Sequence, residues 1–132
     1  MIGLDTNILV RYFIRDDHAQ AQSADRIMEH RLSGANPGYV TLVVLVELTW
    51  VLERSYQQSQ QEIADVLYAM LSNEVFAIQN ELQVHIAYMT VRQGRGTFAD
   101  ALVAALGTWA GCTTTLTFDR KASRLPGFEL IR

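Results

Sequence analysis

Four acidic residues of this chain have mainly apolar or small neighbours in the sequence: Asp5, Glu47, Asp100 and Asp119. A carboxylate that is buried in its ionised form without a partner is costly, so proteins protonate it, pair it with a cation or use it to bind a metal ion. Several such carboxylates together indicate a site for a divalent cation. Because the ligands are oxygen atoms, the expected ion is Mg²⁺, with Mn²⁺ as a possible substitute.

Two of the four acids follow sequences that are typical of strands. Asp5 ends a short apolar run and precedes a helix that Thr6 or Asn7 could cap. Asp119 follows the run Thr117-Phe118, which ends a strand expected at 113–118. Acids at strand ends suit the crevice beyond the carboxyl ends of parallel strands, where open sheets place their sites.

The other two acids are expected on helices. Glu47 interrupts an apolar helix, and the residues three and four positions away offer no cation for an ion pair. Asp100 falls in the first turn of an Ala-rich helix, where the helix dipole favours a negative charge.

Each acid taken alone also has a structural interpretation. Asp5 could cap a helix or belong to a turn, Asp100 could complete a capping box begun by Thr97, and Asp119 could lie in a solvated turn. Glu47 is harder to explain, since a Glu on an apolar helix is rarely buried without a reason. Together the four favour a site.

In this order and context, the acids resemble those of the PIN-domain ribonucleases, and within that family the VapC toxins of toxin–antitoxin pairs. The resemblance covers nearly the whole chain, from Asp5-Thr6-Asn7 at the start to Thr117-Phe118-Asp119 near the end. It implies that Asp5, Glu47, Asp100 and Asp119 are both catalytic and metal-binding, with Thr6, Asn7 and Thr117 as polar support. It also implies an Mg²⁺-dependent endoribonuclease that leaves a 5′-phosphate and a 3′-hydroxyl.

The resemblance further implies three partners. The substrate is RNA, the inhibitor is a cognate antitoxin protein, and the chain pairs with itself as a homodimer. An antitoxin Arg placed among the four carboxylates would imitate the metal ion.

The net charge of -3 is unusual for a nucleic-acid enzyme. This negative charge is a weaker argument against RNA binding if the four acids bind metal, because the remaining residues then have a small positive net charge. All but one of the 11 basic residues are Arg, which suits bidentate phosphate contacts. The candidate RNA contacts lie near the acids in the sequence: Arg11, Arg15, Arg92, Arg95, Arg120, Lys121 and Arg124.

Three other classes of protein share part of this pattern, and the residues argue against the first two. A haloacid-dehalogenase phosphatase needs a second acid two residues after Asp5, and that position is Asn7. A non-catalytic RNA-binding module of the same fold would be expected to lose one or more of the acids. An RNA-maturation nuclease without an antitoxin shares the chemistry and stays open.

Length and pattern predict a single domain over residues 1–132, an α/β/α sandwich with a central, mainly parallel sheet. Expected strands lie at 1–4, 38–40, 75–78, 113–118 and 128–131, and expected helices at 7–15, 19–31, 41–55, 60–72, 81–93 and 97–110. The apolar runs are too short to cross a membrane and no signal sequence is evident, so a cytoplasmic protein is expected.

The single cysteine, Cys112, is expected in the core.

Overall fold

The computed structural model describes residues 1–132 and contains parallel strands separated by helices. The strands are β1 (Ile2–Gly3), β2 (Gly38–Val40), β3 (Phe76–Ile78), β4 (Thr115–Thr117) and β5 (Phe128–Leu130). The α-helices are α1 (Thr6–Phe13), α2 (His18–Arg26), α3 (Leu42–Tyr56), α4 (Gln60–Leu71), α5 (Glu81–Arg92) and α6 (Phe98–Trp109). A π-helical turn, η1 (Ile27–Arg31), continues α2, and a 3₁₀ turn, η2 (Ala122–Arg124), separates the last two strands. The α/β class is confirmed, and each expected element is present within a few residues.

Local capping explains where several helices begin. Ser59 and Glu62 form the capping box at the start of α4, each accepting the other's backbone N–H. Thr41 and Thr97 cap α3 and α6 with their hydroxyl oxygens. Short polar side chains at these positions therefore determine where the sheet-to-helix connections end.

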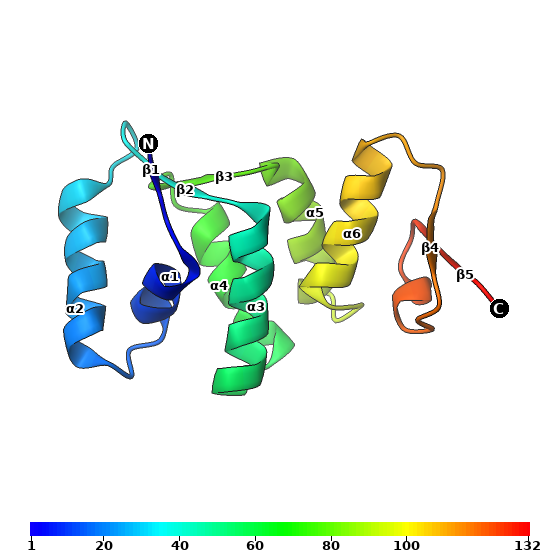
Figure 1. Cartoon of the computed structure of the whole chain (residues 1–132), viewed down its shortest axis with the longest axis horizontal. Helices are drawn as coiled ribbons and strands as arrows, with labels where there is room; N and C mark the ends of the chain where they lie inside the picture. The colour runs from blue at the N-terminus through cyan, green and yellow to red at the C-terminus, as the bar shows by residue number, and fades with distance from the viewer.

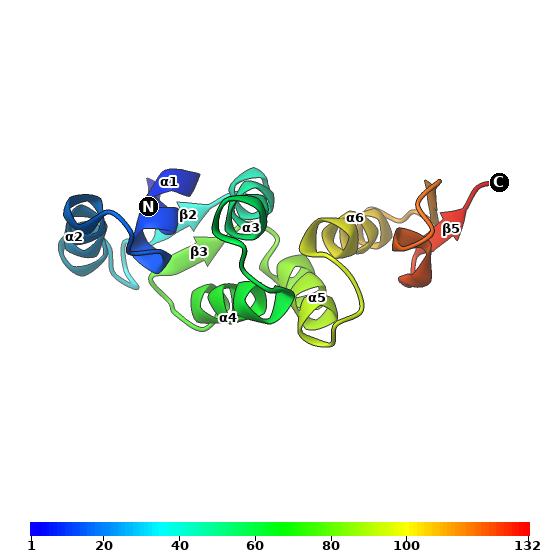
Figure 2. The ribbon, with the colours of Figure 1, turned by 90° about the horizontal axis from the view of Figure 1, so that it is seen from below.

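The first three strands form the centre of a layered arrangement. Strand β2 pairs in parallel with β1 on one side and with β3 on the other. Figure 2 shows α1 and α3 on one face of this sheet and α4 on the opposite face. Helix α3 contributes fully buried leucines to the core, at positions 45, 48 and 52. This burial supplies the main driving force for folding of this part of the chain.

Gly38 begins β2 where the packing leaves no space for a side chain. A Cβ atom at this position would lie 2.5 Å from Cδ1 of Leu4 and 3.0 Å from Cδ1 of Leu32. Both leucines are buried. Glycine therefore allows the backbone of β2 to approach the core side chains closely.

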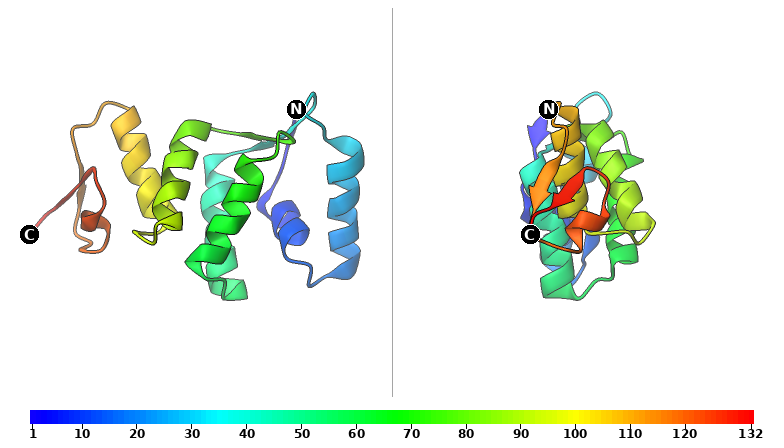
Figure 3. Two further views of the ribbon diagram at one scale, coloured as in Figure 1. Left: turned by 180° about the vertical axis from the view of Figure 1, so that it is seen from behind. Right: turned by 90° about the vertical axis from the view of Figure 1, so that its right-hand side faces the viewer.

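The last two strands form a second parallel sheet of their own. Figures 1 and 3 show β4 and β5 at one end of an elongated molecule, beyond α6, with β1 towards the other end. The expected central sheet is thus divided in two. The residues of β4 and β5 were predicted well because strand propensity is local, whereas the partner of an edge strand is decided by distant packing.

The connection between α6 and β4 contradicts one expectation. Cys112 lies there and is exposed, so the prediction of a core cysteine is wrong, because this segment lies outside the packed layers. None of the helices is both long and apolar enough to cross a membrane.

Candidate functional site

Asp5 lies two residues after β1 and immediately before α1. Its Oδ1 atom accepts the backbone N–H of Thr6 at 2.7 Å, and its side chain is exposed. Asp5 is therefore the N-cap residue of α1, and the expectation that Thr6 or Asn7 caps this helix is wrong. Asp5 takes the N-cap position because α1 begins one residue earlier than expected.

The two neighbours of Asp5 differ in their surroundings. Thr6 is buried, and its Oγ1 atom has no hydrogen-bond partner in the chain. Asn7 is exposed. A buried hydroxyl without a partner is costly. The Asp5-Thr6 segment thus has a polar atom that is not satisfied by the chain itself.

Glu47 lies on α3 and is exposed, although an apolar helix suggested burial. It lines a groove of about 500 Å³ between α3 and the first turns of α6. The other lining side chains are mainly apolar and include the exposed Val43, Trp50 and Val103. Glu47 is thus an isolated charge in an apolar surface groove, which is why its local sequence suggested burial.

Asp100 is half-buried in the first turn of α6, as expected. Its backbone N–H donates to Oγ1 of Thr97 at 3.3 Å. The return bond of a capping box, from the Thr97 N–H to the Asp100 carboxylate, is absent. The Asp100 carboxylate is therefore not used in capping.

Asp119 lies just beyond β4, at the start of a tight turn. Its N–H donates to Oγ1 of Thr117, and its Oδ1 accepts the N–H groups of Lys121 and Ala122 at 2.8 and 3.3 Å. Thr117 thereby supports the Asp119 backbone. The Asp119 carboxylate orders the turn, but it remains exposed.

The four acids do not meet within one chain. No group of three or more Asp, Glu, His or Cys side chains converges where it could hold a metal ion. Asp5 ends a strand of the first sheet, whereas Asp119 ends a strand of the second. The donor atoms suit Mg²⁺, but their arrangement in a single chain does not fit a metal site.

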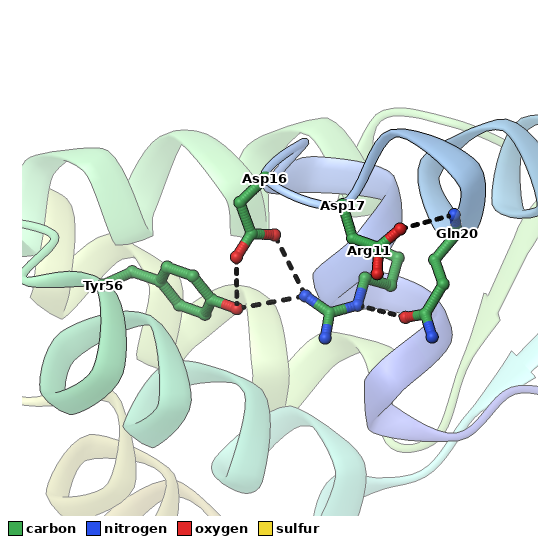
Figure 4. Close-up of polar contacts among 5 residues, drawn as sticks. All are labelled: Arg11, Asp16, Asp17, Gln20 and Tyr56. Atoms are coloured by element: carbon green, nitrogen blue, oxygen red, sulfur yellow. Dashed lines mark hydrogen bonds and ion pairs between the residues drawn. The ribbon is translucent and has the colours of Figure 1, made fainter.

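Three of the candidate RNA contacts are already engaged within the protein. Figure 4 shows Arg11 between Gln20 of α2, Asp16 of the connecting turn and Tyr56 of α3. The hydrogen bond from Arg11 to the Tyr56 hydroxyl is the main reason that the pKa of Arg11 is raised. This network fixes the α1–α2 turn against the end of α3, and the sequence pattern had not indicated it because its members are far apart.

Arg15 and Arg92 are engaged in a similar way. Arg15 donates two hydrogen bonds to Asp25, and they lower the pKa of that carboxyl group. Arg92 bonds to the Tyr88 hydroxyl and to Asp65 on α4, and both bonds raise the pKa of Arg92. These arginines hold helices together.

The remaining candidates are exposed and make no ion pair: Arg95, Arg120, Lys121 and Arg124. Three of them follow Asp119 directly, in the turn that its carboxylate orders. This segment, residues 120–124, is called the basic turn below. It carries three exposed basic side chains that make no ion pair within the chain.

The alternation of parallel strands and helices, with acids after β1 and β4, places the chain among α/β proteins whose sites lie at strand ends. The chain matches the PIN domain family over residues 2–127 and belongs to that family. It is also similar to a protein named VapC ribonuclease from Aquifex aeolicus (strain VF5), at 23% identity over 128 residues. That alignment covers 97% of this chain and 93% of the relative.

Proposed function

We propose that this chain is a metal-dependent endoribonuclease that acts as the toxin of a toxin–antitoxin pair. The observation that carries the proposal is the presence of all four acids, in order, on a PIN domain that aligns along 97% of its length with a VapC ribonuclease. Its substrate is RNA. It works as a single domain in the cytoplasm, where that substrate is found.

The proposed catalytic and metal-binding residues are Asp5, Glu47, Asp100 and Asp119, with Thr6, Asn7 and Thr117 in support. These carboxylates would hold a divalent ion such as Mg²⁺, which would supply a reactive water and neutralise charge on the phosphate. The chain itself supplies the oxygen donors and the unsatisfied Thr6 hydroxyl. The basic turn would hold the RNA backbone beside Asp119.

The test is cleavage of a single-stranded RNA by the purified chain. Cleavage is expected with added Mg²⁺, is expected to stop with EDTA, and should return when Mg²⁺ is added in excess, because ionised carboxylates alone do not activate water strongly. RNA cleavage that continues at the same rate in EDTA would contradict the metal-dependent mechanism. An absence of cleavage in both buffers would contradict the ribonuclease itself.

Removing three charges from the basic turn should weaken RNA binding. For the variant with Arg120, Lys121 and Arg124 replaced by Ala, the slope of log K against log [salt] should become shallower by about 2, given roughly 0.7 per phosphate contact for single strands. The measurement is fluorescence anisotropy in EDTA, which prevents cleavage. A control with Arg26, Arg31 and Arg54 replaced by Ala removes the same charge elsewhere and should leave the slope nearly unchanged. Equal slopes in the two variants would exclude the basic turn as the contact surface.

The proposed antitoxin fits the groove that contains Glu47. The groove combines apolar side chains with a carboxylate, so a partner segment with apolar residues around an Arg would suit it. A disordered segment that folds on binding can cover such a groove and release it when the partner is degraded. Expression of the chain alone in its native host should arrest growth, and co-expression of the neighbouring gene product should relieve the arrest. Harmless expression of an RNA-cleaving chain would favour a maturation nuclease.

A further inference from the structure

Four strands in this molecule have an unpaired edge: β1, β3, β4 and β5. Two of them, β1 and β4, are followed two residues later by a candidate site residue, Asp5 or Asp119. Strand β1 pairs only with β2, and strand β4 pairs only with β5. Gly3, at the open edge of β1, is exposed, and a Cβ atom there would meet nothing within 4 Å. Open edges of this kind are templates for pairing with another chain.

The backbone polar groups at these two edges are complementary. The N–H groups of Ile2 and Leu4 donate to the carbonyls of Pro37, just before β2, and Tyr39, in β2. The polar groups of Gly3 therefore point to the open edge. In β4, the Thr115 N–H donates to the Gly127 carbonyl, and the Thr117 carbonyl accepts the Ile131 N–H, so both groups bond to residues that flank β5. The polar groups of Leu116 and Phe118 therefore point to the other open edge.

This alternation allows a parallel register with Gly3 opposite Thr117. In that register the Gly3 N–H and carbonyl meet the Leu116 carbonyl and the Phe118 N–H, as in any parallel ladder. Residues at the same level then share a face of the sheet, so Leu116 lies beside Ile2 and Phe118 beside Leu4. The pairing would cover Leu116 and Phe118, which are 62% and 82% exposed in the single chain.

The same register places Asp5 opposite Asp119. Both residues are two positions beyond the Gly3 and Thr117 pair. The two acids that the single chain keeps in separate sheets would thus lie side by side, at the carboxyl edge of one five-stranded sheet. The pairing would thus add the carboxylate of Asp119 to the candidate site around Asp5.

Within its own chain, β4 is held away from β1 by a series of packed contacts. Helix α5 is fixed to α4 by buried side chains and by the Arg92–Asp65 ion pair at 2.9 Å. Helix α6 packs extensively on α5. Gly127, just before β5, lies close to α6, since a Cβ atom at Gly127 would be 3.5 Å from the Cβ atom of Ala104. Pairing of β4 with β1 of the same chain would break one of these contacts. Pairing of β4 with β1 of a second copy breaks none of them.

We propose that two copies of this chain exchange their C-terminal sheets, so that β4 of each copy pairs with β1 of the other. A symmetric exchange of this kind pairs the open edges of β1 and β4 in both copies at once. Each candidate site then takes Asp5 and Glu47 from one copy and Asp119 from the other. The shared site rests on the proposed ribonuclease function, whereas the strand pairing does not.

Disulfide trapping tests the strand pairing without reference to activity. Gly3→Cys and Thr117→Cys are made in separate full-length chains, each with the exposed Cys112 replaced by Ser, and are co-expressed with different tags. Mild oxidation should give a covalent dimer that contains both tags. Ile2→Cys with Leu116→Cys is a second pair in the same register, in case one variant folds poorly. Gly3→Cys with Glu129→Cys is the matched control and should not cross-link, because Glu129 is on β5, one strand further away.

The outcomes separate the alternatives. A disulfide within one chain, in the variant that carries both Gly3→Cys and Thr117→Cys, would overturn the exchange in favour of closure of each chain on itself. No disulfide from either cysteine pair would overturn the pairing altogether.

Complementation tests the shared site. Asp5→Asn and Asp119→Asn chains, each inactive alone, should form a mixed dimer with one intact site of two, and hence about half of wild-type activity. A mixed dimer of Asp5→Asn and Glu47→Gln should stay inactive, because both residues come from the same copy in each site. If wild type cleaves RNA while the Asp5→Asn and Asp119→Asn dimer does not, the shared site is wrong. If wild type itself is inactive, the proposed function fails, and disulfide trapping still decides the pairing.

Discussion

Replacing Asp5 by Asn should reduce RNA cleavage at least 100-fold and leave the melting temperature within about 2 °C of wild type. Asn caps a helix about as well as Asp, so the bond from the Thr6 N–H is retained. Only the negative charge is lost, and loss of a charged catalytic group typically costs about 10²–10⁴-fold in rate. The measurements are cleavage of a labelled RNA and thermal unfolding.

Asp17→Asn is the matched control for this variant. Asp17 caps α2 through the Gln20 N–H and lies outside the proposed site. The same chemical change at the start of the next helix should leave cleavage within about twofold of wild type, since no catalytic charge is removed. Equal losses of cleavage in both variants would show that helix capping, not the charge of Asp5, controls activity.

Leu45→Ala should lower the free energy of unfolding by about 3 kcal/mol. Leu45 is fully buried on α3, and truncation of a buried leucine removes apolar contacts and leaves a cavity, at a typical cost of about 2–5 kcal/mol. Such a change is a large part of the stability of an ordinary domain, about 5–15 kcal/mol. Urea denaturation followed by circular dichroism measures it.

Val43→Ala tests whether this effect comes from burial. Val43 is on the same helix but is 78% exposed, so its truncation should change the free energy of unfolding by no more than about 0.5 kcal/mol. A loss for Val43→Ala that matched the loss for Leu45→Ala would mean that the exposed face of α3 is covered in solution.

The local elements of this protein could be predicted from the sequence because their causes are local. The Ser59 and Glu62 capping box, the Thr97 cap and the helical spacing of apolar residues each act within one or two turns. The strand at β4 followed in the same way from the run of Thr residues that ends at Phe118. The α/β class then followed from the alternation of strands and helices.

The surroundings of individual charges could not be predicted in this way. Glu47 was expected to be buried because its neighbours in sequence are apolar, but those neighbours line a surface groove. Arg11, Arg15 and Arg92 were candidate RNA contacts, but each has partners on another element or on a distant segment. Exposure and pairing depend on residues far away in the sequence.

The sequence by itself determined the elements, the family resemblance and the identity of the four acids, because these depend on short-range patterns and on residue type. Only the tertiary structure decided that Asp5 and Asp119 end strands of two separate sheets. The physical reason is that a strand edge is satisfied by any backbone with matching polar groups. The sequence specifies that β4 is a strand with an open edge. The packing of α4, α5 and α6 decides which other strand can pair with that edge.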